Sequence, residues 1–291
     1  MNHASQVEMI IKTCSNGMNE SFLGERNLKM ALSHDDYPYL YETHLHTSFA
    51  SKCASNTGAE MAKAAKDAGY TGIFVTDHHW GGNCAIDRSL PWDKWVDGFC
   101  AGYYDAKECG DKIGLDVFFG WESGFNGTEF LIYGLTPEWM REHPELRCPW
   151  GEDPDPSWDL TPEKQYKLIR EAGGMMIHAH PFREEWYIPE TRLYPDHVDG
   201  VEIINATHSS PLSKSHNDPE FDDKAIAYAA EHDLPGTAGS DVHSTTMFGG
   251  GVAFRNKLVS AADYCNAIMN GGDYILTNGV NWFDKRGRKI I

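Results

Sequence analysis

The chain has few basic residues for its length. It carries 25 Lys and Arg against 43 Asp and Glu in 291 residues, which gives a formal net charge of −18. Contact with the phosphates of a nucleic acid, or with an acidic membrane surface, needs a basic footprint. The one short basic run, DKRGRK at residues 284–289, is too small to provide it. We therefore expect neither a long nucleic acid nor a membrane among the partners of this protein.

Long apolar runs and paired cysteines are also missing. No stretch approaches the roughly 18 consecutive apolar residues of a membrane span, and residues 1–17 have no charged region that leads into a long apolar core. The seven cysteines are scattered and include no C-x-x-C motif, which argues against a disulfide framework and against a zinc ribbon. These absences predict a soluble, cytoplasmic protein with reduced thiols.

Helix and strand patterns alternate along the chain. Residues 57–70 begin with a capping box, Thr57 with Glu60, continue with an Ala-rich body, and are followed by the β-rich run GIFVT. The same order of helix and then apolar run recurs at residues 161–174, 222–236 and 260–272. Such alternation predicts an α/β fold with a mostly parallel sheet that closes, or nearly closes, into a barrel. An open, doubly wound sheet is the alternative.

We assign residues 34–291 to a single barrel and residues 1–33 to an N-terminal segment of unclear role. The run EFLIYG follows Asn126 and Gly127, a pair typical of tight turns, and is predicted to be the return arm of a hairpin. Three Trp- and Pro-rich insertions are too long to be minimal connections, and they cover residues 79–95, 143–159 and 182–197. Because long loops after barrel strands build the site, we expect these insertions to surround it.

Histidines and carboxylates stand where the predicted strands end. In YETHLHT, His44 and His46 are two positions apart, so on a strand both side chains point to the same face. Other strand ends carry Asp77 and His78, Glu122, His178 and His180, and Asp241 and His243. Because the strand ends of a barrel meet at one mouth, we expect these side chains to lie together. Imidazoles and carboxylates without a cysteine motif are the ligand set of divalent ions such as Zn, Mn or Fe.

The order of these motifs resembles the polymerase and histidinol phosphatase (PHP) family of metal-dependent phosphoesterases. The chain has H-x-H at 44–46, T-D-H at 76–78, G-x-E at 120–122, A-H-P at 179–181 and G-S-D-x-H at 239–243. The resemblance implies a distorted (β/α)7 TIM-like barrel with long loops at its C-terminal face and two or three divalent metal ions (Mn, Fe or Zn) at the strand ends. It also implies hydrolysis of a phosphate ester by a hydroxide that bridges two metal ions.

The resemblance further implies roles for individual residues. The residues that would hold the first metal are His44, His46, Glu122 and Asp241. Glu122 would bridge to a second ion at His180, and a third ion would lie between His78 and His243.

At two places the chain departs from the family pattern. Family members usually have an Asp or His shortly after H-x-H, where this chain offers Cys53, which could bind as a thiolate. Many members also have a His in the strand after G-x-E, and the nearest substitute here is Glu129.

The chemistry suggests further roles around the metal ligands. Asp241 is the candidate proton acceptor, and a protonated His243 would help the leaving alkoxide depart. Arg183 is the candidate phosphate clamp, because a guanidinium can bind two phosphate oxygens at once. Further candidates for substrate contact are Lys52, Asn205 and His208. Residues expected to orient the ligands from behind are Asp77, His79 and His178, and aromatic residues that could wall a small pocket are Trp80, Trp92 and Trp186.

We expect the substrate to be a small phosphorylated metabolite, either a phosphomonoester or a cyclic phosphodiester, because the acidic chain has no basic groove for a longer polyanion. Two alternatives remain open. One is a non-catalytic or accessory metal-binding PHP barrel. The other is an amidohydrolase-like barrel that acts at a carbonyl; that class typically has a metal-bridging Lys at a strand end, and the sequence shows none there.

Overall fold

The computed structural model describes residues 33–151 and 154–290, so the predicted N-terminal segment, residues 1–33, lies almost wholly outside the described residues. In the described part, ten strands form one sheet in the order β10-β9-β8-β1-β2-β3-β4-β5-β6-β7. The strands are β1 (Tyr39–Leu45), β2 (Gly72–Val75), β3 (Asp116–Phe125), β4 (Thr128–Tyr133), β5 (Met175–Ala179), β6 (Gly200–Asn205), β7 (Gly236–Gly239), β8 (Gly250–Phe254), β9 (Tyr274–Asn278) and β10 (Trp282–Asp284).

The sheet curls until the chain beyond β7 meets the end of β1. The His46 amide donates to the Val242 carbonyl at 2.9 Å, and the Val242 amide donates to the His44 carbonyl at 3.1 Å. Strands β8, β9 and β10 extend the sheet from the other edge of β1, each antiparallel to its neighbour. The predicted α/β class is confirmed. The sheet is a curled half-barrel that carries antiparallel strands, so the predicted distorted (β/α)7 barrel is not confirmed.

The hairpin between β3 and β4 explains part of this difference. Asn126 and Gly127 both have positive φ, 49° and 89°, as the tight hairpin turns that suit twisted strands require. The turn brings β4 back antiparallel to β3, and β5 then pairs antiparallel with β4. The predicted hairpin is therefore confirmed. The hairpin stands where a helical crossover would connect two parallel strands, and this is one reason why the sheet is not uniformly parallel.

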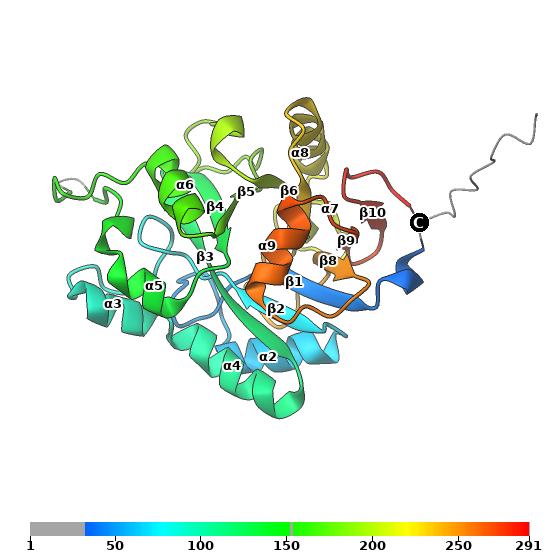
Figure 1. Cartoon of the computed structure of the whole chain (residues 1–291), viewed down its shortest axis with the longest axis horizontal. Helices are drawn as coiled ribbons and strands as arrows, with labels where there is room; N and C mark the ends of the chain where they lie inside the picture. Colours follow the sequence, from blue (N-terminus) through cyan, green and yellow to red (C-terminus); the bar gives the residue numbers. More distant parts are fainter. Residues whose placement is uncertain (1–32, 152–153, 291) are drawn as a thin grey trace, which may run out of the picture. The chain divides into compact units, whose positions relative to one another are not determined.

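The helices are α2 (Gly58–Asp67), α3 (Trp92–Phe99), α4 (Ala101–Ile113), α5 (Pro137–Glu142), α6 (Pro162–Glu171), α7 (Ala206–Ser209), α8 (Glu220–Glu231) and α9 (Ala261–Met269), with short 3₁₀ turns η1 (His34–Asp36), η2 (Pro144–Leu146) and η3 (Pro195–His197). In Figure 1, α2 and α4 lie together along one side of the sheet. The capping box of α2 is present, because Thr57 Oγ1 accepts from the Glu60 amide and Glu60 accepts from the Thr57 amide. No helix in the described residues is long and apolar enough to cross a membrane.

The tryptophans of the insertion at residues 79–95 pack in or against the core. Trp80 and Trp95 are buried, and the rings of Trp92 and Trp95 stack with centroids 5.1 Å apart. Trp80 lies 6.0 Å from Trp92, and neither of the two lines the main cavity of the described residues. The expectation that Trp80 and Trp92 wall a pocket is therefore wrong, because burying such large rings against one another removes them from the cavity surface.

Candidate metal centre

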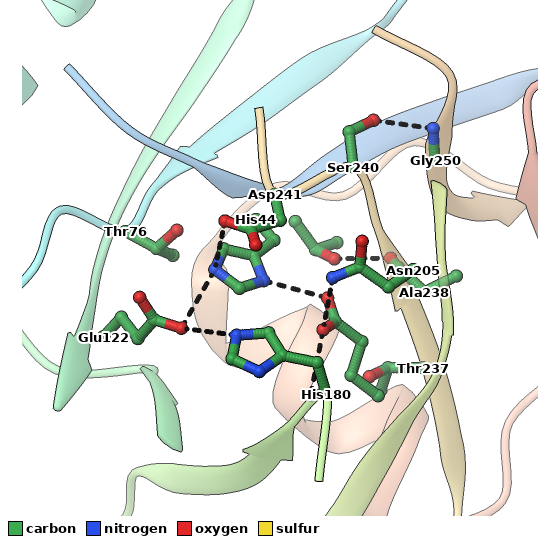
Figure 2. Close-up of polar contacts among 12 residues, drawn as sticks. His44, Thr76, Glu122, His180, Asn205, Thr237, Ala238, Ser240, Asp241 and Gly250 are labelled. Carbon is green, nitrogen blue, oxygen red and sulfur yellow. Dashed lines mark hydrogen bonds and ion pairs between the residues drawn. The ribbon is translucent and has the colours of Figure 1, made fainter. Parts of the chain in front are cut away.

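Glu122, in β3, is the centre of a buried cluster of imidazoles. Its Oε1 lies 3.2 Å from His44 Nε2 and 3.1 Å from His180 Nε2. Its Oε2 lies 2.7 Å from His78 Nδ1 and 3.6 Å from His46 Nε2. Figure 2 shows His44 and His180 reaching this carboxylate from different strands. The sheet thus brings together four histidines that are distant in sequence.

Asp241 closes the cluster from the segment that follows β7. Its Oδ1 lies 3.1 Å from His46 Nε2 and 3.3 Å from His44 Nε2, and Figure 2 shows His44 between the two carboxylates. His243 lies at the rim, with Nδ1 3.7 Å from the same Oδ1 and 2.9 Å from the Asp241 carbonyl oxygen. The two histidines of the H-x-H motif therefore point to one place, as strand alternation predicts.

The two residues that depart from the family pattern also lie here. The Glu129 carboxylate is 3.8 Å from His78 Nδ1 and 3.6 Å from His180 Nε2. The Cys53 thiol lies beside His78 and His243. Burial would raise the pKa of Cys53, but contact with these imidazoles outweighs burial and lowers it to about 6. Glu129 thus forms a group of close ligand atoms with His78 and Glu122, whereas Cys53 lies at the rim of the cluster.

The donor set fits divalent cations. In the described part of the chain, His44 Nε2, His78 Nδ1 and Glu122 Oε2 are buried without a hydrogen bond of acceptable geometry. Leaving such groups unsatisfied costs free energy, and a cation among them would remove that cost. Groups of three ligand atoms that lie within 4.8 Å of one another are His46, His78 and His243; His44, His46 and Glu122; His44, His180 and Asp241; and His78, Glu122 and Glu129. Nitrogen and carboxylate oxygen donors suit Zn, Mn and Fe.

The electrostatics of the cluster also favour a cation. Burial would lower the pKa of His44, but Asp241, Glu202 and Glu122 outweigh it and raise that pKa well above its usual range. Burial would raise the pKa of Asp241, yet His44 and Arg183 hold it well below its usual range. The Asp241 carboxylate therefore stays ionised at neutral pH.

Two hydrogen bonds orient the H-x-H pair from behind. His44 Nδ1 donates to Glu202 Oε1 at 2.9 Å, which leaves the lone pair of Nε2 facing the cluster. Ser51 Oγ donates to Asp77 Oδ1 at 2.7 Å and lies 3.2 Å from His46 Nδ1, which orients His46 in the same way. Asp77 thus contacts His46 through Ser51. Glu202 was missed, although a lone carboxylate inside the apolar run VDGVEIIN was a signal that it has a buried partner.

His178 does not share the face of His180, contrary to expectation. His180 has φ of 27°, so the strand alternation that relates positions i and i+2 breaks there. The His178 ring stacks on Phe130 with centroids 4.9 Å apart and lies outside the cluster. Such backbone strain is typical of functional sites, and Asp241, with φ of 53°, shows it too.

His79 is likewise not behind a ligand. Its ring lies among aromatic side chains, with centroids 4.9 Å from Trp95, 5.3 Å from Phe99 and 6.0 Å from Trp121. Burial and Arg88 lower its pKa to about 3. The expectation is wrong because the side chain turns into the aromatic core, away from its neighbour His78.

A cavity of 1180 Å³ opens over the cluster, and Arg183 lies in its wall. Arg183 Nη2 pairs with Asp241 Oδ2 at 2.6 Å, and its Nε donates to His208 Nε2 at 3.0 Å. Thr207 Oγ1 accepts from Nη2 at 3.3 Å. Within the described part of the chain, these contacts engage Nε and Nη2 and leave Nη1 for a ligand. The guanidinium thus belongs to the site.

The other residues expected to contact substrate do not line this cavity. Asn205 is buried as the N-cap of α7, where it accepts from the Thr207 amide at 3.0 Å. His208 Nδ1 contacts Asp222 at 2.9 Å, so this ring supports Arg183 from behind. Lys52 is exposed outside the cavity lining. All three predictions are therefore wrong. Asn205 and His208 follow the end of β6 but lie beneath the cavity floor, and Lys52 points to solvent from the loop after β1.

Comparisons with known proteins agree with the motifs. Residues 219–272 match the family model described as PHP-associated. An uncharacterized protein of Methanocaldococcus jannaschii is 26% identical over 148 residues, which are 51% of this chain and 66% of that protein. The match therefore spans just under two thirds of the relative.

Solved structures show a related fold. A two-domain protein from Bacteroides vulgatus, described as containing a predicted PHP-like metal-dependent phosphoesterase, aligns with a TM-score of 0.54 and 14% identity over 83% of this chain and 65% of that one. An amidohydrolase from Chromobacterium violaceum aligns with a TM-score of 0.44 and 16% identity over 70% of this chain and 87% of that one, too distantly to bear on function. The ordered motifs and the PHP-associated match support a PHP family protein, and the solved structure shows a related fold.

Proposed function

We propose that this protein is a metal-dependent hydrolase that cleaves a phosphate ester of a small metabolite, either a phosphomonoester or a cyclic phosphodiester. One observation carries the proposal. A buried cluster of imidazoles and carboxylates, centred on Glu122, lies beneath a cavity of 1180 Å³ that also presents the Arg183 guanidinium. Anion recognition and cation binding thus share one site.

The cluster would hold two or three divalent ions, Mn, Fe or Zn. The side chains that would hold them are His44, His46, His78, Glu122, Glu129, His180, Asp241 and His243, with Cys53 at the rim. Bound there, such ions supply a water of lowered pKa and charge that neutralises the phosphoryl oxygens.

The side chains of the chain supply positioning and proton transfer. Arg183, held by His208 and Asp241, presents a nitrogen to a phosphoryl oxygen and orients the ester. Asp241 Oδ1 faces the cluster and is the group that accepts a proton from the attacking water. His243 Nδ1 contacts the Asp241 carbonyl oxygen, so its Nε2 is free either to hold an ion or, when protonated, to donate to the leaving alkoxide.

The cavity lining argues against the amidohydrolase-like alternative. In the described residues no lysine lines the cavity, whereas that class typically uses a lysine that bridges two metals. The accessory-barrel alternative makes a different prediction, which is that the protein binds metal ions and releases no product.

The test is release of inorganic phosphate from a panel of phosphomonoesters and cyclic phosphodiesters by protein loaded with Mn²⁺ or Zn²⁺. A cyclic diester is followed by chromatography, because its first cleavage frees no phosphate. We expect hydrolysis by the native protein and a loss of at least about a hundredfold in Asp241→Asn. The same rate in native protein and variant would point to a contaminant. Protein with its metals bound and no product from any ester would favour the accessory barrel.

A further inference from the structure

The cavity has two chemically different halves. The floor carries the ionisable cluster and Arg183. The outer wall is largely aromatic and apolar, and it includes Phe125, Leu160 and Met247 together with Trp150, Trp186 and Tyr187. A phosphoryl group needs only the floor. The outer half is therefore available for the part of the substrate that is not phosphate.

Trp186 is the most informative residue of the outer wall. It belongs to the insertion that follows His180, and 92% of its surface is exposed although it lines the cavity. Tyr187 packs edge-on against it with ring centroids 5.6 Å apart. A large exposed aromatic side chain at the mouth of a cavity indicates a binding surface, because nothing in the fold of the described residues covers it.

Trp150 is held at the wall by a cation. The Arg88 guanidinium carbon lies 3.9 Å from the centroid of the Trp150 ring, and Arg88 itself donates to the Trp80 carbonyl at 2.7 Å and to the Gly82 carbonyl at 3.0 Å. One face of Trp150 is therefore used by Arg88. The residue still lines the cavity, so a rigid aromatic surface remains for a ligand.

Charge limits what else the substrate can carry. Among the described residues that line the cavity, Arg183 and Arg192 are the only Lys or Arg side chains. Arg192 Nη2 is engaged by the hairpin turn, where it donates to the carbonyls of Phe125 and Asn126. A second phosphate or a carboxylate far from the reacting phosphoryl group would therefore have Arg192, with its Nη2 already engaged, as its only Lys or Arg partner among the described lining residues.

We propose that the outer half of the cavity is a subsite for a flat aromatic group, so that the substrate is a monophosphate ester whose alcohol carries an aromatic ring that stacks on Trp186. This rests on the proposed function, since it assumes that a phosphoryl group occupies the floor. Stacking against an aromatic wall favours a ring over an aliphatic chain or a hydroxylated chain of similar reach. The proposal excludes small hydrophilic sugar phosphates as the preferred substrates.

The experiment compares 2-phenylethyl, propyl and glycerol phosphates, whose leaving groups are all simple alkoxides, on metal-loaded native protein, Trp186→Ala and Tyr104→Ala. Tyr104 is the matched control, because it is also an exposed aromatic residue but lies on α4 outside the cavity lining. We expect kcat/KM of the native protein and of Tyr104→Ala to favour the phenylethyl ester by about tenfold over the propyl ester, and Trp186→Ala to lose most of that ratio. Equal kcat/KM for the three esters, or a ratio that survives Trp186→Ala, would overturn the subsite.

Failure of the proposed function looks different. If none of the esters releases phosphate, the result counts against phosphoesterase activity. The subsite is then tested alone, by calorimetric measurement of the binding of two stable analogues, 3-phenylpropylphosphonate and butylphosphonate. Tighter binding of the phenyl analogue, lost in Trp186→Ala, supports the subsite. Equal affinities, or no binding of either analogue, overturn it.

Discussion

Glu202 and His44 are joined by a hydrogen bond of 2.9 Å that runs from Nδ1 of the imidazole to Oε1 of the carboxylate. The other oxygen of Glu202 accepts from the His180 amide at 3.2 Å, so one buried carboxylate positions residues on both sides of Glu122. Through the first bond, Glu202 sets which nitrogen of His44 faces the cluster. Its position behind the ligands makes it a strong determinant of metal affinity.

We predict that Glu202→Gln lowers the affinity for Zn²⁺ by about 10- to 100-fold, because an amide NH₂ can turn toward His44 and favour the wrong tautomer. Competition with a chromophoric chelator measures the change. Glu231→Gln, at an exposed position of α8, is the matched control and is expected to bind like the native protein. Unchanged affinity in Glu202→Gln would show that the hydrogen bond does not orient a ligand.

Metal removal is expected to destabilise the protein. Without cations, three atoms of the cluster are buried without a hydrogen bond: His44 Nε2, His78 Nδ1 and Glu122 Oε2. Saturating Zn²⁺ or Mn²⁺ at about 100 times Kd contributes about 2.7 kcal/mol per site, which corresponds to roughly 5 to 10 °C in Tm for a domain of this size. Thermal unfolding with chelator and after metal addition measures the shift.

The matched variants for this shift are Glu122→Gln, which removes the central carboxylate, and Glu108→Gln, which alters an exposed carboxylate on α4. We expect the metal-dependent rise in Tm to be lost in the first and kept in the second. A full rise in Glu122→Gln would place the cation elsewhere.

Arg183→Lys is predicted to lower kcat/KM for phosphate esters by about 10- to 100-fold, because a single ammonium group cannot hold His208, Asp241 and a phosphoryl oxygen together. Steady-state kinetics on metal-loaded protein measure the loss. Arg286→Lys, whose partner Asp233 lies on the surface, is the control. Native kinetics in Arg183→Lys would remove the guanidinium from the proposed phosphate contact.

His79 predicts a pH dependence of folding. Burial and Arg88 lower its pKa from 6.5 to about 3, so below pH 6.5 the unfolded chain binds a proton that the folded chain does not. The stability associated with the neutral ring is complete above pH 6.5 and is lost as the pH falls toward 3. At pH 5 this amounts to about 2 kcal/mol.

We therefore compare the native protein with His79→Phe, which keeps an aromatic ring in the same surroundings, both without metal. Between pH 7 and pH 5, we expect the free energy of unfolding to fall by about 2 kcal/mol more in the native protein than in the variant. Urea unfolding at both pH values measures the difference. His232→Phe, at an exposed position, controls for loss of a histidine. Equal pH dependence in native protein and His79→Phe would mean that the buried ring is protonated in the folded state.

The sequence by itself was enough for the α/β class, the hairpin at Asn126 and Gly127, and the convergence of His44 with His46. Each rests on local rules. A turn pair with positive φ dictates a tight hairpin, and strand alternation places positions i and i+2 on one face. The apolar surroundings of Glu122 and Asp241 were likewise a local signal, since a buried carboxylate must have a partner.

Other features were decided by tertiary structure alone. The left-handed backbone of His180 separates it from His178, and no sequence rule announces where a strand breaks its alternation. The apolar run around Glu202 signals a buried partner, but only the tertiary structure shows that this partner is His44. The proximity of Glu129 and Cys53 to the cluster, and the burial of Trp80 away from the cavity, depend on how the sheet curls. Local sequence determines which face a side chain takes on its own element, whereas the packing of distant elements determines what that face meets.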